Sequence, residues 1–381
     1  MAGRETNKKD FKTMTSRIKI LFIIPSLRGG GAERVMVNLL RHLDRSKFKP
    51  LLAVVNLKSA VYLEELATDV ELFDLNCDRV RYALPKIIRL IWNIRPQVVF
   101  STLGHLNLWL AILQPLLPKK TNYLCRETTI VSVAIKIESA FYQKFWPWAY
   151  KAFYNRFEMI ICQSKYMRDD MLASFNISAD KIVVINNPVD IDQLGQLCLA
   201  TVATGMLKVK GSSTTHLVSA GRMVRVKGFD LLIEALALNA NPSVFLTLLG
   251  EGPLLEELKA LAQLRGIAAQ IRFVGYQKNP YPFFAQADAY VLSSRYEGFP
   301  NVVLEAIACG TPVIATPAVG GTSEILNDMA GCLMTERVSA KSLAVALATF
   351  SYGKRLAPDA AKSYEIGKIV KLYEQQFIKV S

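Results

Sequence analysis

Short apolar runs alternate with helix-length segments along most of the chain, and this alternation constrains the fold more than any other feature. The first run, residues 18–24, ends at Pro25 and is followed by a glycine-rich turn at 29–31 and an amphipathic segment at 32–43. Further apolar runs follow at residues 50–57, 98–101, 122–125, 159–163 and 182–185. Repeated alternation of this kind predicts a parallel, doubly wound sheet.

A second series of the same kind begins after residues 190–215, where the periodicity gives way to Gln, Thr, Gly, Ser and Lys. We interpret that segment as a connection between two domains. The second series has expected strands at 216–220, 245–250, 271–274, 289–292 and 312–315, and expected helices at 230–238, 253–264, 301–308 and 341–350. The length of 381 residues also exceeds the roughly 250–300 at which one core usually stops growing.

These observations predict an α/β protein with two Rossmann-like, doubly wound domains that face each other across a cleft. The N-terminal domain is expected at residues 18–195 and the C-terminal domain at 196–358. Residues 1–17 are expected to form a disordered tail. Residues 359–381 are expected to contain a last helix, near 363–377, for which crossing back to the N-terminal domain is one alternative.

Positive charge is concentrated in the first half of the chain. The net charge is +14, and residues 1–195 hold 28 Lys and Arg against 18 Asp and Glu, which leaves +4 for the rest. We therefore expect an anionic partner for the first half: a phospholipid surface, a diphosphate-bearing substrate or nucleic acid. The basic residues form no dense run and no nucleic-acid-binding motif is present, so no nucleic-acid partner is expected.

The expected compartment is the cytoplasm. Six cysteines are scattered without a C-x-x-C pair, which favours free thiols in a reducing environment. The polar start of the sequence lacks the apolar core of a signal peptide. The longest apolar stretch, residues 103–117, is interrupted by polar residues and is shorter than the about 20 residues of a spanning helix, so no membrane span is expected.

Two loops that follow predicted strands have the composition of anion-binding loops. Residues 29–31 do not match G-x-G-x-x-G, and they form either a tight turn or a loop that faces a phosphate or substrate. Gly221, Arg222 and Lys227 follow the first strand of the second series. The two basic side chains can donate to a diphosphate, whereas in isolation they would be a solvated charge pair.

The segment from Glu297 to Glu305 carries two carboxylates. They lie eight residues apart, a little over two helical turns, so both can point the same way along one helix and its entry loop. Gly298 lets the backbone approach a ligand, Pro300 fits a helix start, and Asn301 can cap the helix. Either glutamate alone would be a surface carboxylate, but the preceding apolar strand places both where ligands bind in doubly wound folds.

Taken in order, these pieces resemble the retaining glycosyltransferases of family 4, which have the two-domain GT-B fold. They extend from about residue 18 to 350 and comprise residues 29–34, His105, Ser164, residues 187–190, Gly221 with Arg222, Lys227 with Gly228, residues 250–254, Gly275 with Tyr276, and residues 297–305. The resemblance implies transfer of a hexose or N-acetylhexosamine from a nucleotide-sugar, with UDP as the expected carrier, in bacterial glycan assembly.

The resemblance also implies a role for each matching residue. The catalytic set is His105, which orients the sugar, Arg222 and Lys227, which neutralise the leaving diphosphate, and Glu297, which holds the donor sugar. The donor-binding set, in which Glu305 binds the ribose and Tyr276 lies beside the base, is Gly30, Gly31, Gly221, Tyr276, Gly298, Phe299, Asn301 and Glu305. Without the resemblance, His105 beside its leucines would be interpreted as a core residue.

The acceptor side departs from the family's pattern. Many members that act on lipid-linked acceptors have a histidine after the strand near residue 125, whereas this chain has Arg126 and Glu127, which are expected to shape the acceptor site differently.

The segment 140–156 mixes aromatic residues with three basic ones, a composition typical of either an interfacial helix or a core helix. The basic residues are Lys144, Lys151 and Arg156. Together with the basic first half, this suggests a polyprenyl-diphosphate-linked saccharide acceptor and peripheral association with the anionic inner face of the cell membrane.

No metal or other cofactor is expected, because fixed cations can stabilise the leaving group. The one D-x-D match, Asp190 with Asp192, lies in the expected connection. The family's retention of configuration suggests front-face attack by the acceptor hydroxyl. A non-hydrolysing nucleotide-sugar epimerase would keep the same charged residues without an acceptor, and a basic nucleic-acid-binding protein is the non-enzymatic alternative.

Overall fold

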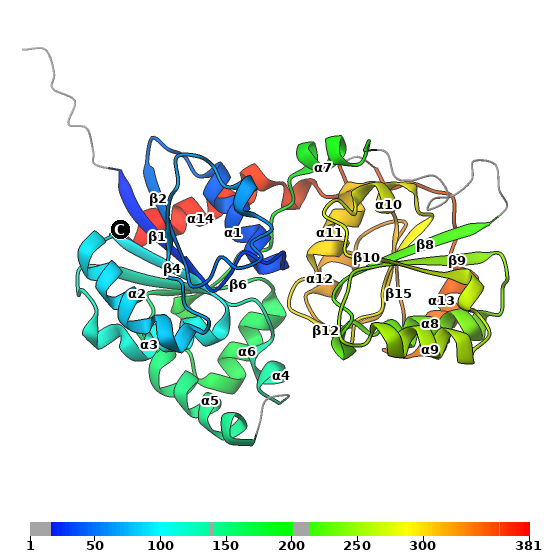
Figure 1. Ribbon diagram of the computed structural model, residues 1–381, viewed down its shortest axis with the longest axis horizontal. Coiled ribbons are helices and arrows are strands. Elements are labelled where there is room, and N and C mark those ends of the chain that lie inside the picture. Colours follow the sequence, from blue (N-terminus) through cyan, green and yellow to red (C-terminus); the bar gives the residue numbers. More distant parts are fainter. Residues whose placement is uncertain (1–16, 137–139, 201–213, 358) are drawn as a thin grey trace, which may run out of the picture.

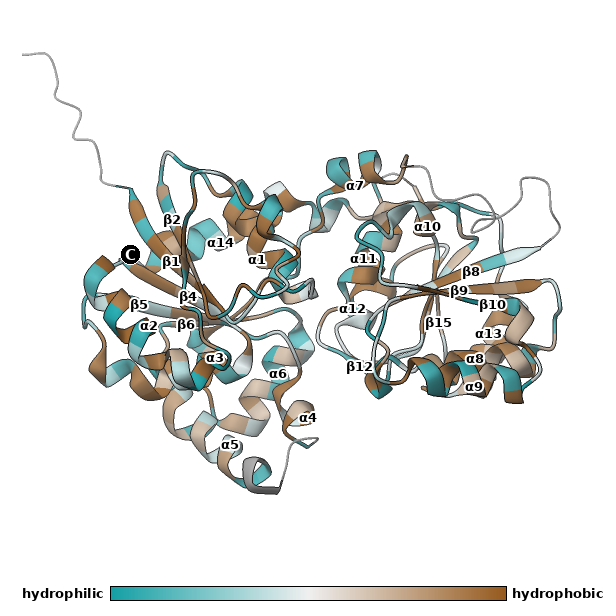
Figure 2. Ribbon diagram, viewed as in Figure 1, coloured by the Kyte–Doolittle hydropathy of each residue, from teal (hydrophilic) through white to brown (hydrophobic). Residues whose placement is uncertain are grey.

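The computed structural model describes residues 17–136, 140–200, 214–357 and 359–381. Nearly all of the expected tail at 1–17 and half of the expected connection at 190–215 lie outside the described residues. The described residues form two α/β domains with GT-B architecture, which confirms the predicted fold class (Figure 1). Apolar residues concentrate in the central strands of both domains and polar residues on the outer helices (Figure 2).

The described part of the N-terminal domain contains a seven-stranded parallel sheet with the order β3-β2-β1-β4-β5-β6-β7. Its strands are β1 (Ile18–Ile24), β2 (Phe48–Val54), β3 (Glu71–Asp74), β4 (Val98–Thr102), β5 (Asn122–Arg126), β6 (Met159–Cys162) and β7 (Ile182–Val184). Leu21 pairs with Leu51 on one side and Val99 on the other. The strand order therefore reverses between β1 and β4, the kind of position where doubly wound sheets bind ligands.

Helices cover both faces of this sheet, because successive residues of each strand point to opposite sides. Along β1, Leu21 and Ile23 belong to one apolar cluster, whereas Ile20, Phe22 and Ile24 belong to another. The helices are α1 (Gly31–His42), α2 (Val80–Ile94), α3 (Gly104–Leu113), α4 (Val131–Lys136), α5 (Ala140–Phe153) and α6 (Lys165–Phe175), with short 3₁₀ turns at Leu63–Glu65, Gln114–Leu116, Tyr154–Arg156 and Ala179–Lys181.

The last helix, α14 (Ile366–Val380), packs on the N-terminal sheet although it follows the C-terminal domain in sequence (Figure 1). Its buried residues recur at helical spacing, and Phe377 makes edge-on contacts with Phe22 and Phe100. The chain thus crosses between the domains twice. The two crossing segments lie side by side, since Val189 N–H donates to the carbonyl of Tyr364 and Ile366 N–H to that of Val189.

The C-terminal domain repeats the arrangement, with the strand order β10-β9-β8-β11-β13-β15 and a reversal between β8 and β11. Its strands are β8 (Thr215–Ala220), β9 (Val244–Leu249), β10 (Ile271–Gly275), β11 (Ala289–Leu292), β13 (Val313–Ala315) and β15 (Leu333–Met334), and a separate pair is formed by β12 (Tyr296–Glu297) and β14 (Val319–Gly320). Its helices are α8 (Phe229–Asn239), α9 (Leu255–Leu264), α10 (Tyr281–Gln286), α11 (Asn301–Ala308), α12 (Thr322–Leu326) and α13 (Ala340–Thr349), with 3₁₀ turns at Arg225–Lys227, Ala268–Gln270 and Lys362–Tyr364.

The helix α7 (Ile191–Leu197) begins the connection between the domains. Among the described residues, no helix combines the length and the apolar character that a membrane crossing needs.

Candidate functional site

The candidate site is built from loops that follow the strands at both reversal points. In the N-terminal domain these are the loops after β1 and β4, and in the C-terminal domain the loops after β8 and β11. The loop after β1 and the neighbouring loop after β5 contact the C-terminal domain: Asn301 Nδ2 donates to the carbonyl of Gly31, and a Cβ added at Gly298 would lie 2.9 Å from the carbonyl oxygen of Thr128, which follows β5. Carboxyl ends of parallel strands from both sheets therefore line one interdomain region.

Lys227 and Glu297, both in the C-terminal domain, form an ion pair in this region. Lys227 Nζ lies 2.7 Å from Glu297 Oε1, and the Ser294 hydroxyl donates to the same oxygen at 2.6 Å. The lysine side chain is 26% exposed and the glutamate side chain 11%. A cation and an anion are thus held together at the edge of solvent, where an incoming ligand can reach both.

Arg222 lies one residue beyond Gly221 and is exposed. Within the described residues its side chain forms no hydrogen bond or ion pair, in contrast to that of Lys227. The stem of Lys227 passes over Gly221, where an added Cβ would meet it at 3.6 Å. The structure therefore brings Gly221, Arg222, Lys227 and Glu297 into one neighbourhood.

The helix that carries Glu305 has the expected bounds, but Glu297 lies in a short strand and not in an entry loop. Glu297 belongs to the short strand β12, and α11 begins only at Asn301. The N-cap of α11 is Pro300, which has no side chain able to cap, and Asn301 does not cap the helix as expected. Instead, the Asn301 amide bonds across to Asn187 at 2.5 Å and to Gly31 at 3.1 Å, and so it fixes the domains relative to each other.

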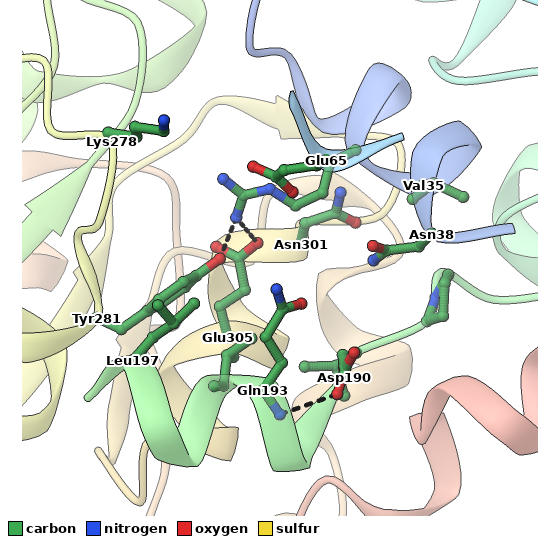
Figure 3. A pocket seen from close by; sticks show the side chains of 14 residues that line it. Val35, Asn38, Glu65, Asp190, Gln193, Leu197, Lys278, Tyr281, Asn301 and Glu305 are labelled. Carbon is green, nitrogen blue, oxygen red and sulfur yellow. Dashed lines mark hydrogen bonds and ion pairs between the residues drawn. The ribbon is translucent and has the colours of Figure 1, made fainter. Parts of the chain in front are cut away.

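Glu305 faces the opposite domain from α11 and is 8% exposed. Its Oε1 lies 2.7 Å from Arg34 Nη1, and the same guanidinium nitrogen donates to the Tyr281 hydroxyl. Tyr281 and Glu305 line a cavity of about 60 Å³ to which both domains contribute residues. Figure 3 shows these two side chains next to each other. Arg34 and Tyr281 were not in the predicted set of site residues, although Arg34 ends the glycine-rich segment 29–34 that the sequence singled out.

His105 lies at the start of α3 and is exposed, whereas the next two residues, Leu106 and Asn107, are buried. His105 is therefore not a core residue, which was the alternative interpretation. Leu103, directly before the helix, has φ +78°, a strained value for a residue with a side chain. An added Cβ at Gly104 would lie 2.6 Å from the Tyr150 hydroxyl, so the backbone is held tightly where His105 emerges.

Of the remaining donor-side residues, some border the opposite domain and some do not. Tyr276 is 47% exposed, and its hydroxyl would be 3.5 Å from a Cβ added at Gly29. Gly30 packs against the Glu33 side chain. Phe299 is buried and packs against Tyr364, so its side chain supports the loop and does not line open space.

Arg126 and Glu127 are both fully buried. Arg126 Nη2 donates to Asn187 Oδ1 at 2.5 Å. Glu127 Oε1 accepts from the Tyr154 hydroxyl and, at 3.0 Å, from Asn107 Nδ2. Burial raises the pKa of Glu127 to about 7, against the hydrogen bonds and the Arg126 charge that lower it. Neither side chain offers exposed surface to an acceptor, so any effect on the acceptor site passes through neighbours.

The aromatic segment contains both a core face and an exposed face. Tyr150 and Tyr154 are buried, whereas Trp148 is 57% exposed and Lys144 and Lys151 are exposed. Arg156 instead points inward and donates to the carbonyls of Ala111 and Ile112.

The D-x-D match serves as a helix cap. Asp190 is the N-cap of α7 and accepts from the backbone N–H of Gln193 at 2.9 Å. Within the described ranges, no group of three or more His, Cys, Asp or Glu residues is arranged to hold a metal ion.

Two family models match the chain over consecutive regions. Residues 29–193 match the model described as Glycosyltransferase Family 4, and residues 209–363 match Glycosyl transferases group 1. These two regions are the two domains that the site residues come from.

Among curated relatives, the chain is 28% identical over 371 residues to N-acetylgalactosamine-N,N'-diacetylbacillosaminyl-diphospho-undecaprenol 4-alpha-N-acetylgalactosaminyltransferase of Campylobacter jejuni, covering 93% of this chain and 97% of the relative. A stretch of 103 residues is 45% identical to a lipopolysaccharide core biosynthesis glycosyltransferase of Rhizobium meliloti, which is 27% of this chain and 30% of the relative.

Among solved structures, HepE of Anabaena in complex with UDP and glucose superposes with a TM-score of 0.77 at 17% identity, covering 95% of this chain and 100% of that one. Sucrose-phosphate synthase of Thermosynechococcus elongatus gives a TM-score of 0.75 at 19% identity, covering 95% and 100%. At these identities, the structural likeness shows the fold alone.

Proposed function

Because this chain belongs to the family 4 glycosyltransferases, with a group 1 glycosyltransferase domain as its second half, we propose that it transfers a sugar from a nucleotide-sugar to a lipid-linked saccharide. The donor is a UDP-linked hexose or N-acetylhexosamine, and the product keeps the anomeric configuration. The observation that carries this proposal is the pair Lys227 and Glu297, with Arg222 nearby, at the reversal point of the C-terminal sheet.

The basic residues suit a diphosphate leaving group. When the glycosidic C–O bond breaks, negative charge develops on the departing phosphate oxygen, and a fixed cation close to that oxygen lowers the barrier. Lys227 is held in place by Glu297 before the donor arrives, and Arg222 is exposed. In the proposed complex both donate to the diphosphate and take the place of a divalent metal ion, so we propose that the reaction is independent of metal.

Glu297 suits sugar binding better than nucleophilic attack. Its Oε1 already accepts from Lys227 and Ser294, which stabilises the charged carboxylate and lowers its nucleophilicity. We therefore assign Glu297 to the hydroxyls of the donor sugar. The acceptor hydroxyl then attacks the same face that the diphosphate leaves, and its proton passes to the departing phosphate oxygen. His105, exposed at the start of α3, orients the sugar from the other domain.

Two observations support a lipid-linked acceptor. The Campylobacter relative, by its name, acts on a saccharide attached to diphospho-undecaprenol. In this chain, Trp148 and two exposed lysines on the same helix give an apolar and cationic surface of the kind that lies at a membrane interface. We propose peripheral association with the inner face of the cell membrane, with the acceptor's diphosphate and lipid reaching the N-terminal domain.

The test is a transfer assay with UDP-, GDP- and ADP-linked hexoses and N-acetylhexosamines, with and without an undecaprenyl-diphosphate-linked saccharide. We expect release of nucleoside diphosphate that depends on the acceptor and persists in excess chelator, with retained configuration in the product by NMR. Interconversion of the nucleotide-sugar without an acceptor would indicate an epimerase instead. A strict requirement for Mg²⁺ or Mn²⁺ would contradict the assigned role of the two cations.

A further inference from the structure

We propose that Arg34 is a positioning residue that orients the Glu305 carboxylate for the ribose of the donor, so that donor affinity depends on closure of the two domains. This inference rests on the proposed nucleotide-sugar function. It adds a residue from the N-terminal domain to a nucleoside site that otherwise belongs to the C-terminal domain.

Arg34 joins the two domains through one guanidinium group. It belongs to α1, which begins at Gly31, and its Nη1 lies 2.7 Å from Oε1 of Glu305 on α11. The same nitrogen donates to the Tyr281 hydroxyl on α10, and Nε donates to the Tyr62 hydroxyl at 3.0 Å. The guanidinium carbon lies 5.5 Å from the centre of the Tyr62 ring and 5.7 Å from that of Tyr281, one ring from each domain.

Glu305 needs this partner. Its side chain is only 10% exposed, and a carboxylate held away from water is destabilised unless a cation or several donors compensate it. The cation comes from the other domain, so separating the domains removes it. Closure therefore determines whether Glu305 is held as an oriented acceptor.

The geometry leaves one carboxylate oxygen for a ligand. Arg34 bonds Oε1, and within the described residues Oε2 has no hydrogen bond. A ribose presents two neighbouring hydroxyl groups, which donate well to a fixed carboxylate oxygen. In this arrangement Arg34 does not touch the nucleotide; it acts on it through Glu305.

A second interdomain ion pair offers a matched control. Lys278 Nζ lies 2.9 Å from Glu64 Oε2, also between the domains, but both side chains are well exposed, at 64% and 82%. An exposed pair of this kind contributes little to stability. Glu64→Gln removes an interdomain ion pair without touching Glu305, whereas Arg34→Gln removes the one that orients it.

The experiment measures the dissociation constants of UDP and of 2′,3′-dideoxy-UDP by calorimetry for the full chain and its variants. We expect Arg34→Gln to weaken UDP binding about tenfold to a hundredfold, as for a lost hydrogen bond to a charged group, and to change dideoxy-UDP binding much less. Arg34→Lys should fall in between, because an ammonium keeps the charge but loses the fork that reaches Glu305 and Tyr281 together.

Glu305→Gln should weaken UDP binding as Arg34→Gln does. The double variant with both changes should bind UDP no more weakly than either single variant, and Glu64→Gln should bind it as the wild type does.

The outcomes separate this inference from the proposed function. A wild-type chain that binds none of UDP, GDP and ADP overturns the proposed function and this inference with it. If the wild type binds UDP but Arg34→Gln and Arg34→Lys bind it equally well, the inference alone fails. An equal loss for UDP and dideoxy-UDP in a variant that melts like the wild type also overturns it, because a ribose-directed role must distinguish the two nucleotides.

Discussion

The two domains hold their charged groups near the interdomain region in opposite ways. In the C-terminal domain, Lys227 and Glu297 pair at the edge of solvent, with 26% and 11% of their side chains exposed. In the N-terminal domain, Arg126 and Glu127 are fully buried among hydrogen-bond partners. A pair that solvent can reach can exchange its partner for a ligand, whereas a buried charge that loses its partner is strongly destabilised. The comparison assigns ligand chemistry to the Lys227–Glu297 pair and a structural role to Arg126 and Glu127.

The buried residues nonetheless connect with the site. Arg126 bonds Asn187, and the Asn187 amide donates to Asn301 and to the carbonyl of Phe299 in the donor-side loop. A change in the N-terminal core is therefore transmitted to the position of that loop. The sequence predicts an influence of Arg126 on the acceptor site, whereas these contacts connect it with the donor-side loop.

The largest expected effect is on stability and falls on Arg126. Arg126→Ala removes the donor to Asn187 Oδ1 and leaves a cavity at one of the largest fully buried side chains, and large-to-small changes in a core typically cost about 2–5 kcal/mol. We expect that loss in urea unfolding. Lys120→Ala, at an exposed position of the same domain, should stay within about 0.5 kcal/mol of the wild type. An unfolding midpoint for Arg126→Ala equal to that of Lys120→Ala would break the comparison.

The second effect is on activity and falls on the C-terminal pair. Lys227→Ala and Arg222→Ala should each lower kcat about 10²–10³-fold, or about 2.7–4 kcal/mol, because each removes a cation from the leaving group. The unfolding midpoint of Arg222→Ala should remain close to that of the wild type, whereas Lys227→Ala should stay folded with a lower midpoint, because Glu297 is mostly buried and loses its cation. Arg225→Ala, an exposed arginine in the same 3₁₀ turn, is the control and should retain most activity. Near-normal turnover in both test variants would remove the catalytic assignment.

Much of the fold could be predicted from the sequence, because strong apolar periodicity decides it. The run at residues 18–24 matches β1 at both ends, and α11 was expected at its observed bounds. The two-residue strands β12 and β14 could not be predicted, since so short a pattern carries no period and their pairing depends on Gly320, whose added Cβ would overlap the Glu297 carbonyl. For the same reason, the sequence predicts an entry loop at Glu297, where the structure has strand β12.

The candidate site was predictable where it follows strand ends and not where it depends on the other domain. Gly221, Lys227 and Glu297 follow strands of one sheet, so their proximity could be inferred. The Arg34–Glu305 pair joins residues 271 positions apart on separate domains, and only the assembled structure brings them together. Arg126 and Glu127 show the converse: the sequence places them after a strand but does not reveal their complete burial.

A third, smaller effect is a pH dependence of stability that originates in Glu127. Burial raises its pKa from 4.5 to about 7, so the folded protein holds the proton more tightly than the unfolded chain. The resulting stabilisation is complete below about pH 4.5 and is lost as the pH rises through about 7. We expect the melting temperature to fall between pH 5 and 8 by more in the wild type than in Glu127→Gln.

The control is Glu158→Gln, at an exposed position, in which the melting temperature should change with pH as it does in the wild type. Equal slopes in all three proteins would show that Glu127 does not titrate in this range.

The smallest effect concerns the exposed face of α5 and tests whether the N-terminal domain also has a surface that binds ligands. Each lysine that comes near an anionic bilayer contributes about 1 kcal/mol, and salt screens this over a Debye length of about 10 Å at 0.1 M. We expect the protein to bind vesicles containing anionic lipid at low salt and to be released at high salt.

Lys144→Ala with Lys151→Ala should weaken binding by about 2 kcal/mol, and Trp148→Ala should weaken it further, because an exposed indole contributes apolar contact at the interface. The matched pair Lys341→Ala with Lys354→Ala removes the same charge from exposed positions of the C-terminal domain and should change binding much less. Equal losses in the two double variants would mean that net charge alone drives adsorption. No binding by the wild type to either neutral or anionic vesicles would favour an acceptor that is not held in a membrane.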